Sequence, residues 1–167
     1  LQSFSRNDTI RPNRNAPLPG FPVREKEAVI MSMNTVPERL AALRAAMAAN
    51  GVAVYLIPVG DPHASEYLPC HYTSLTWFSG FHGENSNFVV TRTESALWAD
   101  GRYFVQAEKE IAGTEIKLQR MGEPGVPTVE EYCANALNEG EALGLCGLTA
   151  STALVNGLKK ALEKKCA

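Results

Sequence analysis

The sequence lacks the features that mark several large classes of protein. No apolar run approaches the roughly 18–20 residues that cross a bilayer, and no apolar signal-peptide core follows the basic residues near its start. Its 16 Lys and Arg nearly balance 18 Asp and Glu, so the net charge of −2 gives no basic surface for nucleic acid or an anionic membrane. The four cysteines form no Cys-x-x-Cys pair, which favours free thiols in a reducing compartment. These absences predict a cytoplasmic protein with no membrane and no nucleic-acid partner.

The composition is that of a globular domain with a tail. With 45% apolar and 20% charged residues over 167 positions, the chain can bury a core of its own. Residues 1–34 differ from the rest, because they hold four arginines, four prolines and no helical or strand period. Such a segment buries too little apolar area to offset its ordering entropy. We therefore expect a disordered or loosely packed arm over 1–34 and a folded domain over 35–167.

From residue 35 onward, capping signals and periodicity predict alternating helices and strands. Thr35 and Glu38 form a capping box before one helix, and Thr128 and Glu131 form another. The near-continuous apolar run 52–59 is typical of a buried strand. Further strands are predicted over 87–91, 96–99, 115–119 and 143–148, a helical turn over 64–68, a short helix or strand over 75–78, and helices over 102–111 (capped by Asp100) and from 151. This order predicts an α/β fold in which helices flank a mixed β-sheet.

Side chains that could carry catalytic chemistry are present, but their spacing matches no familiar arrangement. His63, His71 and His82 lie near Cys70 and Asp61, yet the intervals differ from those of standard zinc sites. Cys70 and His71 are adjacent, and adjacent side chains rarely point at one another, which argues against a nucleophilic pair. The loop acids for which no partner is evident are Asp61, Glu66, Glu84 and Asp100. The residues by themselves therefore predict neither a catalytic set nor a metal site.

Four stretches of the sequence nevertheless resemble one family. They are 57–67 (IPVGDPHASEY), 78–81 (FSGF), 96–107 (ALWADGRYFVQA) and 121–128 (MGEPGVPT). In order and spacing they are similar to the N-terminal creatinase-like domain of aminopeptidase P, the Xaa-Pro aminopeptidase. The resemblance implies a creatinase/prolidase N-terminal domain with a mixed sheet of ribonuclease-H-like topology, which agrees with the element order above. The motif residues to which it gives a structural role are Asp61, His63, Glu66, Tyr67, Asp100, Gly101, Arg102 and Tyr103.

The same resemblance implies that catalysis takes place outside this sequence. In these enzymes a separate C-terminal domain binds two divalent metal ions, manganese or zinc, and the hydroxide that bridges them attacks the Xaa–Pro bond. The resemblance covers roughly residues 36–150, so none of those ligands can be placed here, and we expect no catalytic residue, cofactor or metal in this chain. The family's domain continues past its last helix into another strand. The sequence is therefore expected to be a fragment of a homodimeric enzyme.

One loop departs from the family's pattern. After Ser-Gly-Phe the family has small residues, whereas this chain has bulkier polar ones over 83–87. Loops that a rigid sheet positions often make functional contacts. His82, Glu84 and Asn85 are therefore candidates for docking the catalytic domain, of the same chain or of a second subunit, or for controlling substrate access. A stand-alone protein-interaction module on the same fold remains the alternative.

Overall fold

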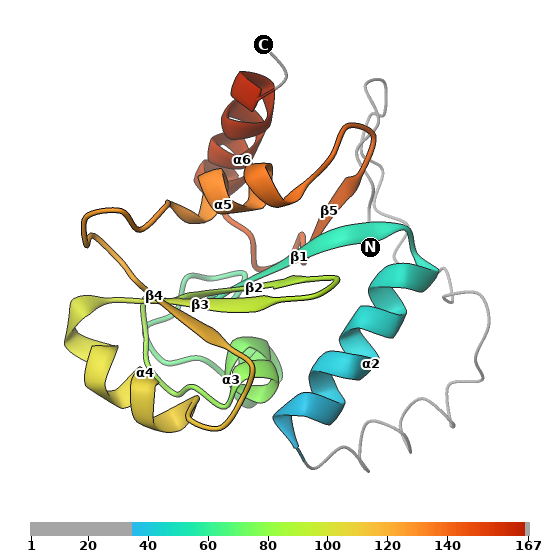
Figure 1. The fold of residues 1–167 in the computed structure, drawn as a ribbon. Coiled ribbons are helices and arrows are strands. Elements are labelled where there is room, and N and C mark those ends of the chain that lie inside the picture. Colours follow the sequence, from blue (N-terminus) through green and yellow to red (C-terminus); the bar gives the residue numbers. More distant parts are fainter. Residues whose placement is uncertain (1–34, 166–167) are drawn as a thin grey trace.

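The computed structural model describes residues 35–165, so the arm expected over 1–34 lies outside the described residues. In the described part, one five-stranded sheet has the order β4-β3-β2-β1-β5 (Figure 1). Its strands are β1 (Val52–Pro58), β2 (Asn87–Thr91), β3 (Ser95–Ala99), β4 (Lys117–Arg120) and β5 (Ala142–Leu145). The pairs β1–β2 and β2–β3 are antiparallel, whereas β1–β5 and β3–β4 are parallel. The predicted mixed sheet of an α/β fold is confirmed.

Helices cover both faces of this sheet. They are α2 (Val36–Ala49), α3 (Ser74–Ser79), α4 (Phe104–Glu110), α5 (Val129–Ala136) and α6 (Thr152–Lys165). Figure 1 shows α2, α3 and α4 on one side of the sheet and α5 and α6 on the other. Among residues 35–165, no helix combines the length and the apolar character needed to cross a membrane.

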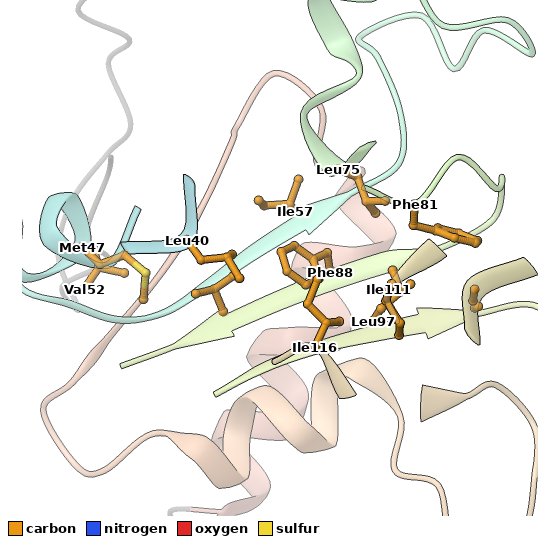
Figure 2. Close-up of a cluster of buried hydrophobic side chains, with 13 residues drawn as sticks. Leu40, Met47, Val52, Ile57, Leu75, Phe81, Phe88, Leu97, Ile111 and Ile116 are labelled. Carbon is orange, nitrogen blue, oxygen red and sulfur yellow. The ribbon is translucent and has the colours of Figure 1, made fainter. Parts of the chain in front are cut away.

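Alternating side chains of the central strands build one apolar core on each face. Phe88 and Leu97 join the cluster beneath α2, α3 and α4, which Figure 2 shows. Their neighbours Val89 and Trp98 join the cluster beneath α5 and α6. This division follows from the two-residue period of a β-strand. Both faces are buried, which explains why β1 and β3 are almost entirely apolar.

Both predicted capping boxes are present. The Thr35 hydroxyl accepts the N–H of Glu38 at 3.4 Å, and the Glu38 carboxylate accepts the N–H of Thr35 at 3.0 Å. At α5 the same reciprocal pair joins Thr128 and Glu131 at 3.2 and 3.0 Å. Each box satisfies N–H groups that a helix start leaves without a partner.

Two predicted elements are wrong in part. The stretch 64–68 is not helical, because Ala64 takes a left-handed φ of +53°, and the helical turn comes later, at Cys70–Tyr72. The last strand ends at Leu145 and not at 148, because the carbonyl of Cys146 accepts two N–H groups from residues 149 and 150 and turns the chain.

The helix predicted over 102–111 begins as a tighter turn. Residues Gly101–Tyr103 form one turn of 3-10 helix, and α4 proper starts at Phe104. The cap expected from Asp100 is present, since its Oδ1 accepts the N–H of Arg102 at 3.0 Å. The carboxylate of Asp100 therefore caps the turn that leads from β3 into α4.

Candidate functional site

Most of the candidate residues lie around one groove at the carboxyl end of β1. The groove has a volume of about 960 Å³ and is formed by the loop after β1, the loop before β2 and the loop after β5. Its walls include Asp61, Glu66, Tyr67, His82, Glu84 and Asn85. Three of the eight motif residues and all three docking candidates therefore line a single surface.

The loop after β1 forms the first wall of the groove, and Asp61 holds this loop in place. Its side chain is buried, with 6% of the residue exposed, and its Oδ1 accepts the N–H groups of His63 at 2.9 Å and Ser65 at 3.0 Å. These bonds hold the turn in which Ala64 has its positive φ. The hydrogen bond from the Ser65 amide is the largest cause that lowers the pKa of Asp61 below its ordinary value. The carboxylate is thus an ionised anchor for the loop.

The loop before β2 forms the second wall of the groove, and it begins where α3 ends. Gly80 has a left-handed φ of +78°, which lets the chain turn away from the helix. The buried hydroxyl of Ser79 donates to the carbonyl of Leu75 at 2.7 Å and accepts the N–H of Phe81 at 3.1 Å. Phe81 places its ring in the core (Figure 2), and Gly83 passes directly over that ring. The loop is therefore tied to the core at its base, while its outer residues face solvent.

The Asp-Gly-Arg-Tyr motif supports this second wall from behind. The Asn85 amide donates to Asp100 at 3.0 Å, and the Arg102 Nε donates to the same carboxylate at 2.9 Å. The Arg102 side-chain hydrogen bond is the largest cause that lowers the pKa of Asp100 to about 2. The Tyr103 hydroxyl donates to Glu84 at 3.4 Å. Asp100, Arg102 and Tyr103 thus position the groove loop rather than line the groove.

His82 is held by α4 and not by a loop neighbour. Its main-chain N–H donates to the Glu110 carboxylate at 2.8 Å, and its imidazole Nδ1 lies 3.4 Å from the other oxygen. Gln106 also donates to Glu110, at 3.1 Å. Two thirds of the His82 side chain is exposed, so the ring is available at the rim of the groove.

The histidine and cysteine side chains weighed as a zinc site do not converge. Among residues 35–165, no three His, Cys, Asp or Glu side chains are grouped closely enough to hold a metal ion. His63 is exposed and stands outside the groove lining, and His71 packs edge-on against Tyr72 at a distance of 4.9 Å. His71 and Cys146 line a separate cavity of about 250 Å³.

One wall of the groove was missed in the sequence. Leu148, Thr149, Ala150 and Ser151, from the loop after β5, also line the groove. The signal that could have found them is topological, because β5 runs parallel to β1 and the carboxyl ends of parallel strands open at the same edge of a sheet. That pairing joins segments far apart in the sequence, and no local pattern predicts it.

A sequence model of the creatinase/prolidase N-terminal domain matches residues 39–167. The chain belongs to this family. Curated relatives include aminopeptidase P2 of Arabidopsis thaliana, which is 39% identical over 132 residues. Those residues make up 78% of this chain and 18% of the plant protein, so the chain spans about a fifth of its relative's length.

Solved structures of creatinase-family proteins agree with the fold. The X-prolyl aminopeptidase of Caenorhabditis elegans, described as a cytosolic enzyme with a di-nuclear active site, has a TM-score of 0.72 and 32% identity over 80% of this chain and 23% of its own. The N-terminal domain of the cytoplasmic peptidase PepQ from Mycobacterium tuberculosis has a TM-score of 0.53 and 26% identity, covering 75% of this chain and 85% of that one. A di-nuclear centre does not fit residues 35–165, which offer no cluster of ligands for it.

Proposed function

We propose that this chain is the non-catalytic N-terminal domain of a metal-dependent Xaa-Pro aminopeptidase, an enzyme that removes the N-terminal residue from peptides with proline second. One observation carries the proposal: the chain is 32–39% identical to such enzymes along most of its length but corresponds to only about a fifth of theirs. The chemistry then belongs to a catalytic domain that binds two divalent ions, manganese or zinc.

The role that suits this domain is to position the catalytic domain and shape the approach of the substrate. The groove supports this role, because its outer residues are exposed while its loops are pinned to the core. His82, Glu84 and Asn85 are the residues through which we expect contact with the catalytic domain, of the same chain or of a second subunit in a homodimer. A cytosolic location follows the description of the nematode relative.

A domain exchange tests the proposal. The matching N-terminal region of the C. elegans enzyme is replaced by residues 35–165 of this chain, and release of the first residue from an Xaa-Pro peptide is measured. We expect the chimera to hydrolyse the peptide and the enzyme without any N-terminal region to lose activity or assembly. Full activity and native assembly in the truncated enzyme would overturn a positioning role.

The groove residues are then tested inside the active chimera. His82→Ala and Glu84→Ala should raise KM or weaken subunit association while the metal content stays constant, since the ligands lie in the other domain. Glu139→Ala is the matched control, because Glu139 is exposed at the opposite end of the sheet, before β5. Unchanged kinetics and assembly in both groove variants would remove the docking assignment and favour an interaction module of another kind.

A further inference from the structure

The groove gathers most of the large apolar side chains that the described residues expose to solvent. Three large apolar residues are exposed in the described part of the chain, and two of them, Tyr67 and Leu148, line this groove. Tyr67 is 82% exposed and follows β1, whereas Leu148 is 69% exposed and follows β5. Exposed apolar residues that come together from separate loops mark a contact surface.

The rim of the groove carries charge of one sign. Glu66 and Glu84 are exposed there, Asp61 lies buried beneath them, and the lining contains no lysine or arginine. Over the whole chain, by contrast, 16 lysines and arginines nearly balance 18 acids. The groove is therefore more acidic than the molecule around it.

No lysine or arginine forms an ion pair with these carboxylates among the described residues, in contrast to several other acids of the domain. Elsewhere Glu94 and Glu141 form ion pairs with Lys117 and Arg92, both at 2.5 Å. In the groove Asp61 is held by backbone N–H groups, and Glu84 accepts only from the Tyr103 hydroxyl among the hydrogen bonds of the described residues.

Arg102 lies behind the groove loop, and its charge is already paired with Asp100. Its guanidinium Nε donates to the Asp100 carboxylate at 2.9 Å, so the two side chains form a pair of zero net charge. The negative charge of the lining is left for a partner to balance.

Resting on the function proposed above, we propose that the groove receives a segment of the catalytic domain in which a lysine or arginine flanks an apolar side chain. The apolar side chain would pack between Tyr67 and Leu148, and the cation would face the carboxylates of Glu66 and Glu84. Complementary charge selects the partner and its register more than it adds affinity. A segment of the same enzyme also has a high effective concentration, so a weak contact suffices.

Synthetic peptides test the groove directly on this chain. The probe is a blocked peptide, Leu-Lys-Ser-Leu-Arg, and its counterparts are Leu-Glu-Ser-Leu-Glu and Leu-Gln-Ser-Leu-Gln. Binding is followed from the backbone amide NMR signals of Gly60, Gly83 and Leu148. We expect the basic peptide to shift these signals, the neutral peptide to bind more weakly and the acidic peptide not to bind. Raising the ionic strength from about 0.01 to about 1 M shortens the screening length from about 30 to about 3 Å, which should abolish the preference.

Two matched pairs of variants assign the charge. Glu66→Gln with Glu84→Gln should weaken binding of the basic peptide about three- to tenfold, as expected for two exposed ion pairs. Glu139→Gln with Glu163→Gln removes the same charge from exposed positions outside the groove lining and should leave binding unchanged.

Equal binding of all three peptides, or a loss equal in both pairs of variants, would overturn the proposed cationic occupant. Binding of no peptide, or self-association of this chain through the groove, would overturn it as well. The domain exchange described above does not depend on the peptides. If the chimera is active but the groove binds all three peptides equally, the proposed function stands and only this inference is rejected.

Discussion

The sharpest prediction about the stability of the domain concerns Gly83, which passes directly over the ring of Phe81. A Cβ on residue 83 would lie 2.2 Å from the ring Cζ of Phe81 and 2.8 Å from one neighbouring ring carbon. Gly83 does not have a left-handed φ, so alanine would cost nothing in backbone strain. Gly83→Ala therefore tests one effect, the overlap between a methyl group and a buried ring.

The size of that effect follows from the position of the ring. Phe81 is fully buried and stacks edge-on against Tyr103, with the ring centroids 6.2 Å apart, so the ring cannot move without disturbing the core (Figure 2). Overpacking of this kind costs about 1–3 kcal/mol. We expect Gly83→Ala to lower the free energy of unfolding by about 2 kcal/mol, which for a domain of this size lowers Tm by roughly 6–10 °C.

Urea unfolding and thermal melting followed by circular dichroism measure the change. Gly147→Ala is the control, because a Cβ there meets no atom within 4 Å, and its effect should stay within about 0.5 kcal/mol. Phe81→Leu makes room for the new methyl group. The double variant should therefore be more stable than the sum of the two single changes predicts, by about 1 kcal/mol. A wild-type melting curve for Gly83→Ala, or strict additivity with Phe81→Leu, would refute the contact.

Three further predictions concern chemistry and titration. The purified chain should release no residue from an Xaa-Pro peptide with added Mn²⁺ or Zn²⁺, since residues 35–165 hold no ligand cluster; metal-dependent release by this chain would contradict the assignment. The pKa of Asp100 falls from 3.8 to about 2, so its ionised form stabilises the fold above about pH 4 and that contribution is lost toward pH 2. The Tm gap between the wild type and Asp100→Asn should accordingly close as pH falls, and a gap constant with pH would argue against the hydrogen bonds. Burial raises the pKa of the Cys133 thiol to about 12, so mass spectrometry after mild alkylation should find label on Cys70 and Cys146 but not on Cys133 until the chain is unfolded.

Local signals in the sequence predicted most of the elements. The capping boxes at Thr35 and Thr128 mark two helix starts because their hydrogen bonds lie within four residues. The apolar run of β1 and the hairpin of β2 and β3 also depend on neighbouring residues. Errors occurred where a backbone hydrogen bond or a positive φ decided the path, as at Ala64 and at the turn held by the carbonyl of Cys146.

The order of the strands and the groove depend on contacts that no local pattern records. β5 pairs with β1 across some 90 residues of sequence, from Val52↔Ala142 to Leu56↔Leu145, with a shift in register near Val54. That shift places Ala53 and Val54 in the same core, so strict alternation would have assigned one of them to the wrong face. The loop that carries Leu148 reaches the groove only because of this pairing.

The motif residues are of two kinds, those that hold the backbone of a loop and those that are exposed at the groove, and the sequence alone does not distinguish them. Asp61 and Asp100 both use their carboxylates on backbone N–H groups, so substitution there changes the shape of a loop. Tyr67 and Glu66 lie on the same stretch as Asp61, but both are exposed at the groove. A motif of acids and aromatics thus contains residues that build the groove and residues that face a partner. The second kind is where substitution should alter association while the isolated domain stays folded.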